Sequence, residues 1–129
     1  MINSTKQSFF GNDAKFHHIG VAVKSINNSL EQITDPIQKV KIAFIELGEI
    51  TLELLEPADD CSPITTSIQK KNKLVHICYS VPNIDAAIIC CKNFGFKTIS
   101  KKQKAVAFDK YIIWVYSATY GLIELIEES

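Results

Sequence analysis

The sequence predicts an α+β fold in which two βαβββ modules form one curved, mixed and largely antiparallel sheet with helices outside it. The first observation behind this prediction is a repeat, because residues 16–23 recur as residues 74–81 at a constant spacing. The second is the pattern Glu-Leu-Leu-Glu at residues 53–56, which recurs at residues 124–127 as Glu-Leu-Ile-Glu. Each half also reads as a strand, a helix and a run of strands. Such repetition predicts one small architecture built twice.

The chain of 129 residues is expected to form a single domain. A loose N-terminal arm is predicted at residues 1–14, which show no sustained periodicity. The domain then covers residues 15–129. Its parts are a first module at 15–58, a linker helix at 62–71 and a second module at 73–128.

The first module opens with alternating hydrophobic residues over 16–23, which predict a strand. His18 shares one face of that strand with small residues, so another group can approach it closely. His17 falls on the opposite face and is expected to be structural or solvent-exposed. Ser25 is a favourable N-cap for a short helix that continues to about Ile33, where an Asp-Pro pair ends it.

A hairpin and a linker complete the first half. Strands are predicted at residues 40–47 and 51–56, joined by a turn at Gly48. The next helix is predicted to start at Ser62 as its cap, with Pro63 in its first turn, where a missing N–H does no harm.

The second module repeats the pattern with one more strand. Residues 74–81 predict a strand, and Asn83 caps a helix over residues 84–93 that Gly95 closes in a left-handed conformation. Further strands are predicted at residues 96–100, 105–108, 111–116 and 122–127.

Composition excludes several classes of function. Fourteen basic side chains balance fourteen acidic ones, which gives no electrostatic reason to bind nucleic acid or an anionic membrane. No apolar run approaches the roughly 20 residues of a membrane-spanning helix. The N-terminus lacks the apolar core of a signal peptide, and the four cysteines show no framework spacing. We therefore expect reduced thiols in a cytoplasmic protein that binds neither nucleic acid nor membrane.

The repeats place four metal-type side chains on equivalent strands. His18 corresponds to His76, and Glu53 corresponds to Glu124. Both carboxylates sit within apolar runs, where a buried charge is costly without a cation or a hydrogen-bond partner. The alternatives are satisfied core histidines and carboxylates on a solvated strand face. The duplication favours ligands of one shared site.

These residues resemble the vicinal oxygen chelate superfamily, which includes glyoxalase I, bleomycin-resistance proteins, extradiol dioxygenases and methylmalonyl-CoA epimerase. The last of these is the closest likeness. The resemblance covers roughly residues 14–128, and the order and spacing of several short segments carry it. These segments are residues 18–23, 53–57, 62–64, 76–78 and 122–125.

The resemblance implies one divalent metal ion (Zn, Ni, Co, Mn or Fe) held by His18, Glu53, His76 and Glu124. Such an ion would chelate vicinal oxygens of a small substrate, with a thioester among the candidates, and stabilise an enolate. The epimerase carries a catalytic Glu on the segment before its second strand, and here that position is Ile37. A hydrocarbon side chain cannot accept a proton.

The sequence therefore predicts a metal-dependent lyase, isomerase or epimerase of the glyoxalase type. Glu124 is the predicted general base and Glu53 the second candidate. Trp114, Tyr116 and Phe44 are candidate substrate-binding residues. Two alternatives stay open: a non-catalytic small-molecule binding protein of the bleomycin-resistance type, and a metal-free scaffold. The family also implies a homodimer, which would cover sheet edges.

Overall fold

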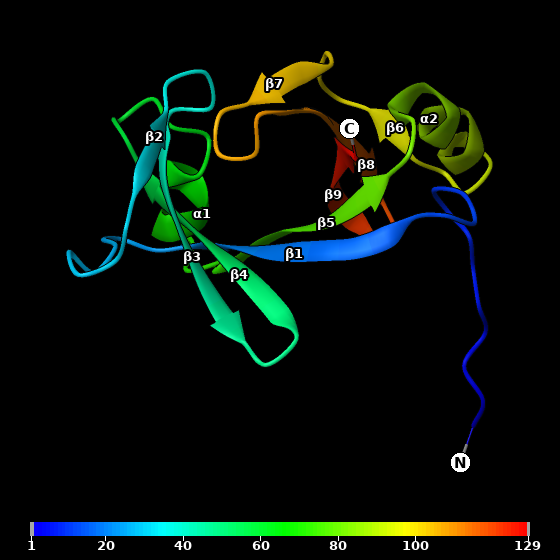
Figure 1. Cartoon of the computed structure of the whole chain (residues 1–129), viewed down its shortest axis with the longest axis horizontal. Helices are drawn as coiled ribbons and strands as arrows, with labels where there is room; N and C mark the ends of the chain where they lie inside the picture. The colour runs from blue at the N-terminus through cyan, green and yellow to red at the C-terminus, as the bar shows by residue number, and fades with distance from the viewer. Residues whose placement is uncertain (1, 129) are drawn as a thin grey trace.

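A computed structural model describes residues 2–128 of the chain. One sheet of nine strands and two helices make up this part of the protein, and the sheet is curved and nearly closed (Figure 1), which confirms the predicted α+β class. The strands are β1 (Lys15–Ala22), β2 (Ile33–Asp35), β3 (Val40–Leu47), β4 (Ile50–Pro57), β5 (Leu74–Val81), β6 (Lys97–Thr98), β7 (Gln103–Ala105), β8 (Lys110–Ser117) and β9 (Gly121–Glu127). The helices are α1 (Thr65–Gln69) and α2 (Ile84–Lys92).

The two modules join where β1 pairs antiparallel with β5. The strand order is β2-β3-β4-β1-β5-β9-β8-β6, with β7 also paired to β8. On either side of the join the arrangement is the same, because β4 runs parallel to β1 and β9 runs parallel to β5. The remaining pairings are antiparallel. The sheet is therefore mixed and largely antiparallel, as the sequence predicts.

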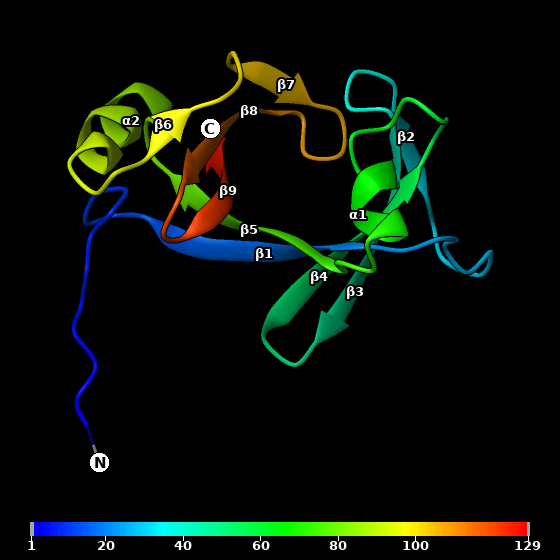
Figure 2. The ribbon, with the colours of Figure 1, turned by 180° about the vertical axis from the view of Figure 1, so that it is seen from behind.

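The second module contributes the larger apolar core. The stripe of α2 residues Ile84, Ala87 and Cys91 is buried against strands β8 and β9, at Val115, Ile123 and Leu125. Asn83 caps α2 as predicted, since its side-chain oxygen accepts a hydrogen bond from the backbone N–H of Ala86. Seen from behind (Figure 2), α2 lies at one end of the sheet, and α1 lies beside β2 at the other.

The helix predicted between Ser25 and Ile33 does not form. Its residues are turns and extended chain, and Ile33 itself begins β2. Asn27 explains part of the error, because its side chain accepts a hydrogen bond from the N–H of Ser29 and fixes a local turn instead. Pairing of β2 with β3 then takes the end of the segment. The first module consequently has no counterpart of α2.

One hydrogen bond persists in both modules despite that loss. The backbone N–H of Ile26 donates to Glu56, and that of Ile84 donates to Glu127, each at 2.8–2.9 Å. The two acceptors are the last residues of the repeated Glu-x-x-Glu pattern. Glu56 and Glu127 therefore bind the backbone of the segments that follow β1 and β5. This structural role distinguishes them from Glu53 and Glu124.

Two smaller predictions are also wrong. The linker helix spans only Thr65–Gln69, with Ile64 rather than Ser62 at its N-cap position. Among the described residues, the Ser62 hydroxyl has no hydrogen-bond partner. The strand expected at 105–108 lies at Gln103–Ala105, and the following residues turn through Asp109 at a φ of 52°. Asp109 bonds back to the carbonyl of Ala105, which closes this turn.

The segment before β1 is anchored by aromatic packing. It contains neither helix nor strand over residues 2–14, yet Phe10 is buried in the core of the second module. Phe9 packs on Phe94, Phe96 and Tyr120 with ring centroids 4.8–5.6 Å apart. Within residues 2–128, no helix is long and apolar enough to cross a membrane.

Candidate metal centre

The four side chains that the repeat singles out converge at the centre of the sheet. His18 comes from β1, Glu53 from β4, His76 from β5 and Glu124 from β9. All four are buried, with at most 4% of each residue exposed. They offer ligand atoms that all lie within 4.8 Å of one another. Two imidazoles and two carboxylates are thus enclosed in the interior without a lysine or arginine paired to them within residues 2–128.

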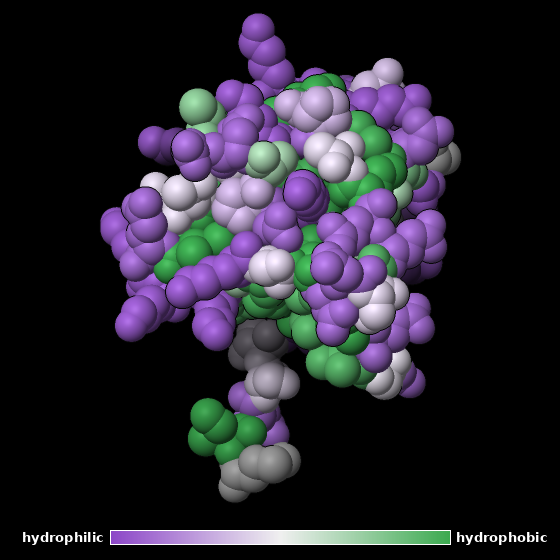
Figure 3. Space-filling model, turned by 90° about the vertical axis from the view of Figure 1, so that its left-hand side faces the viewer, coloured by the Kyte–Doolittle hydropathy of each residue, from purple (hydrophilic) through white to green (hydrophobic). Residues whose placement is uncertain are grey.

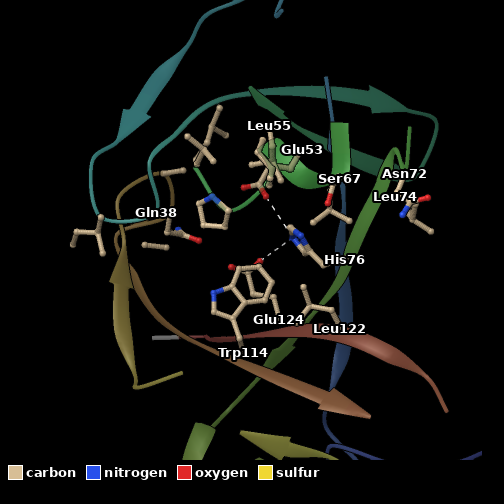
Figure 4. A pocket seen from close by; sticks show the side chains of 18 of the residues that line it. Gln38, Glu53, Leu55, Ser67, Asn72, Leu74, His76, Trp114, Leu122 and Glu124 are labelled. Atoms are coloured by element: carbon tan, nitrogen blue, oxygen red, sulfur yellow. Dashed lines mark ion pairs between the residues drawn. The ribbon is translucent and has the colours of Figure 1, made fainter. Parts of the chain in front are cut away.

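The donor atoms point at one another. The Nε2 atoms of His18 and His76 are 3.2 Å apart. The nearest oxygen of Glu124 lies 3.1 Å from His18 Nε2 and 3.3 Å from His76 Nε2. The corresponding distances from Glu53 are 3.4 and 3.5 Å. Figure 4 shows the two carboxylates on either side of the His76 ring.

These distances fit ligands of a single ion. Two donors that each lie about 2.1 Å from one ion and subtend a right or tetrahedral angle are about 3.0–3.4 Å apart. Glu124 Oε1 is buried and has no hydrogen-bond partner within residues 2–128 although both Nε2 atoms are close, as expected for an oxygen that coordinates rather than accepts. A His₂Glu₂ set suits a divalent transition metal. The residues present therefore fit the ion that the fold implies.

The strand register explains how four side chains share so little space. Gly20 in β1 lies between Glu53 and His76 in the neighbouring strands, and Cys78 in β5 lies between Glu124 and His18. A Cβ atom at Gly20 would lie 2.1 Å from Cε1 of His76. Gly20 therefore creates the room in which the His76 ring sits.

His17 corrects the sequence prediction, because it does not point away from His18. A register shift between Phe16 and His18 makes His17 an extra residue in β1, and such a bulge re-aims side chains. The Nδ1 atoms of His17 and His18 are 2.8 Å apart, a hydrogen bond in which one ring donates. Metal-ligating histidines usually donate their second ring N–H in this way, so His17 can orient His18 with its Nε2 lone pair toward the centre.

Without a metal, the cluster is held by charge. Burial lowers the pKa of His18, but the adjacent Glu124 and Glu53 outweigh it and raise that pKa to about 9. Burial likewise raises the pKa of Glu124, and contacts with His18 and His76 outweigh it and lower that pKa to about 2. The pKa of His17 is lowered by burial and by His18, which keeps His17 neutral and able to accept a hydrogen bond.

A cavity of about 830 Å³ opens onto one side of the centre. Glu53, His76 and Glu124 line it, whereas His18 does not. Of the three candidate substrate-binding residues, Trp114 lines the cavity and packs edge-on against His76 at 4.8 Å. Phe44 and Tyr116 are not among the lining residues, and each is more than a third exposed.

Sequence reasoning missed two residues of this site. Phe108 stacks on the His18 ring at 5.3 Å and also lines the cavity. Gln38 also lines the cavity, and its Nε2 donates a hydrogen bond to the fully buried Asp35 at 2.9 Å. Both residues lie on turns that follow short strands, so no alternation marks them. The sequence signal that could have found them is their equivalent position in the repeat, because Phe108 lies in the turn before β8 and Gln38 in the turn before β3.

Comparison with known proteins agrees with this geometry. Residues 30–114 match the family described as the Glyoxalase/Bleomycin resistance protein/Dioxygenase superfamily. The chain belongs to this superfamily.

Individual relatives narrow the likeness within the superfamily. The mitochondrial methylmalonyl-CoA epimerase of Mus musculus is 29% identical over 144 residues, covering 95% of this chain and 81% of the relative. The crystal structure of hypothetical protein BH1468 from Bacillus halodurans is 32% identical, with a TM-score of 0.75 over 92% of this chain and 96% of that one. A methylmalonyl-CoA epimerase in complex with methylmalonyl-CoA and NH4+ has the same fold, with a TM-score of 0.74, 18% identity and coverage of 90% and 95%.

Proposed function

We propose that the protein is a metal-dependent epimerase or isomerase that acts at a carbon next to a thioester or similar carbonyl. The convergence of two buried imidazoles and two buried carboxylates beside a cavity carries this proposal. The curated relatives add support, since those that match most of the chain are named as methylmalonyl-CoA epimerases.

His18, Glu53, His76 and Glu124 would hold one divalent ion, with Zn, Ni, Co, Mn and Fe as candidates. When bound, that ion would act as a Lewis acid that stabilises negative charge developing on the substrate oxygens. The protein supplies buried histidine rings, with Phe108 packed directly on His18 and Trp114 on His76. Electrostatic interactions are stronger in such a site than in water.

Proton transfer falls to the carboxylates. Glu124 is the proposed general base, because it lines the cavity and has a second carboxylate oxygen besides the Oε1 that faces both histidines. Glu53 is the proposed second group, and it comes from the equivalent strand of the other module. Epimerisation needs a proton removed from one face of a carbon and returned to the other. Two carboxylates flanking His76 from opposite modules suit that requirement. Ile37 lines the same cavity but cannot exchange a proton.

The test is exchange of the α-proton in heavy water, followed by mass spectrometry, with a set of acyl-CoA thioesters that includes methylmalonyl-CoA as the probes. Protein loaded with Mn, Co, Ni or Zn should catalyse exchange, and Glu124→Gln should slow it by at least about 100-fold, within the range seen when a general base is removed. Metal content is measured on both proteins. A Glu124→Gln protein that keeps its metal and its exchange rate would refute the role given to Glu124.

A binding protein without turnover is the second candidate. The observation in its favour is Ile37, at the position where the epimerases that this chain resembles carry a catalytic Glu. In that case metal-loaded protein would bind thioesters or their analogues but would not exchange their α-proton, whichever metal it is loaded with. The same experiment therefore separates the two functions.

We also propose that the protein forms a homodimer. Strands β2 and β6 end the sheet, and the β3–β4 hairpin projects from it (Figure 1). Phe44, Leu47 and Ile50 of this hairpin are exposed. Unpaired strand edges and exposed apolar side chains favour association. Light scattering on the protein as it elutes from a size-exclusion column tests this proposal. A mass of 14.4 kDa, that of one chain, would contradict it.

A further inference from the structure

The cavity wall that faces the metal centre is aliphatic. A small core cluster of the first module is built around Val40, Ile42, Leu55 and Ile64, with Val75 and Ala107 packed against it. All six of these residues line the cavity. This cluster is therefore both the packing core of the first module and an apolar lining of the cavity.

The charged residues that line the cavity disfavour a ligand with a second anionic group at its far end. The carboxylates that line the cavity are Glu53 and Glu124 of the centre, and the lining cations Lys71 and Lys73 are exposed at its rim. The other polar lining groups outside the metal centre, such as Gln38 and Ser67, carry no charge. A buried carboxylate on the ligand would thus lose its water without gaining a cation, which is costly.

The rim is apolar as well. Ile37 and Leu74 line the cavity and are each more than half exposed. On the side of the molecule that carries β2 and α1, apolar surface shows between hydrophilic side chains (Figure 3). A volume of about 830 Å³ lies within the range of pockets that enclose ligands of drug size. It is far larger than a one-carbon substituent requires.

From these observations we infer that the substrate carries, next to its chelating oxygens, an uncharged apolar group of several carbons that lies on the wall from Val40 to Ala107. This inference rests on the proposed function, because the metal centre fixes where the chelating oxygens bind. It goes beyond that function by assigning the class of substituent, aliphatic or aromatic rather than a second carboxylate.

The probe is a series of linear alkyl hydroxamates, which present two vicinal oxygens and an alkyl chain of chosen length. Binding of aceto-, butano-, hexano- and octanohydroxamate to the Mn-loaded protein is measured by calorimetry. We expect the affinity to rise by about fourfold for each methylene that enters the cavity. Adipic monohydroxamate, which ends in a carboxylate, should bind at least 10-fold more weakly than hexanohydroxamate.

Two matched variants locate the binding of the chain. Ala107→Phe places a larger side chain in the cavity and should reduce the gain in affinity with increasing chain length of the hydroxamates. Ala118→Phe makes the same change at an exposed turn outside the cavity and should leave the rise intact. The melting temperatures of both variants are recorded, so that unfolding is not mistaken for lost binding.

The outcomes separate this inference from the function on which it rests. Metal-dependent binding of acetohydroxamate with no gain for longer chains would overturn the apolar wall and leave the metal centre supported. A gain with chain length that is equal with and without Mn would support the wall and count against chelation. Equal affinity for adipic monohydroxamate and hexanohydroxamate would also overturn the inference.

Discussion

Replacing Gly20 by Ala tests whether the centre depends on one missing side chain. The new Cβ would lie 2.1 Å from Cε1, 2.4 Å from Nδ1 and 2.7 Å from Nε2 of His76. Ordinary contact needs about 3.4 Å or more, so the ring must move by more than 1 Å. Metal ligands tolerate only about ±0.2 Å. We therefore expect metal affinity to fall at least about 100-fold, beyond the loss caused by removing an outer-shell partner.

The effect of Gly20→Ala on stability follows from two opposing magnitudes. Because Gly20 lies in a strand without a positive φ, reduced freedom of the unfolded chain would stabilise the variant by about 0.4–1 kcal/mol. Overpacking against His76 costs about 1–3 kcal/mol. The clash wins, and the metal-free variant should lose about 1–2 kcal/mol in urea unfolding.

A double-mutant cycle isolates the contact between Gly20 and His76. In a His76→Ala background the Cβ meets no ring, so adding Gly20→Ala should be neutral or slightly stabilising. Metal affinity is measured by competition with a chelator, and unfolding by urea. Wild-type affinity in Gly20→Ala, or an equal loss of stability in both backgrounds, would refute the reasoning.

Three further predictions concern the surroundings of the centre. His17→Leu removes the acceptor for His18 Nδ1 and should weaken metal binding by about 10-fold or more. His17→Gln should retain most of the metal affinity in the same chelator assay. Equal losses in the two variants would count against an orienting role for His17. In the metal-free protein, the raised pKa of His18 gives stability that is complete below about pH 6.5 and is lost as the pH rises through about 9. The lowered pKa of Glu124 gives stability that is present above its ordinary value and is lost as the pH falls toward about 2. The melting temperature measured by calorimetry should therefore peak between about pH 4.5 and 6.5, and a flat profile from pH 6 to 9 would contradict this. Asp35→Ala leaves the backbone N–H groups of residues 37 and 38 without their acceptor, and should cost about 2–4 kcal/mol in urea unfolding; a loss under 1 kcal/mol would show that water replaces the carboxylate.

The sequence predicts the centre well because strand periodicity is rigid. Side chains alternate with a period of two, so equivalent positions in repeated strands face the same interior. The repeat alone therefore places His18 and His76 together with Glu53 and Glu124, and their convergence is confirmed. Their roles as ligands and base remain predictions.

The parts that alternation does not describe were predicted poorly. The bulge that turns His17 toward His18 depends on pairing between β1 and β5, which no local pattern encodes. The segment from Ser25 to Ile33 has a helical spacing of apolar residues, but the turn at Asn27 and the pairing of β2 override it. The aromatic anchor of the N-terminal segment likewise arises from distant residues such as Phe96. Tertiary contacts decide all three.

The modules differ in how they border the cavity described within residues 2–128, which is lined by Glu53, His76 and Glu124 but not by His18. In the strand register Phe44 opposite Glu53 corresponds to Trp114 opposite Glu124, so the duplicated framework itself is close to symmetric. His18 is covered by His17 and by the stacked ring of Phe108.

His76 has Trp114 packed edge-on against its ring but no counterpart of His17. Its Nδ1 has no hydrogen-bond partner in the part of the chain that the structure describes, and the residue lines the cavity. Valine occupies position 75, where His17 stands in the first module, so no side chain of that kind can bond the ring. A ligand in the cavity would therefore lie on the His76 side of the centre and meet both carboxylates there. The two modules border the cavity unequally, although each contributes one histidine and one glutamate to the centre.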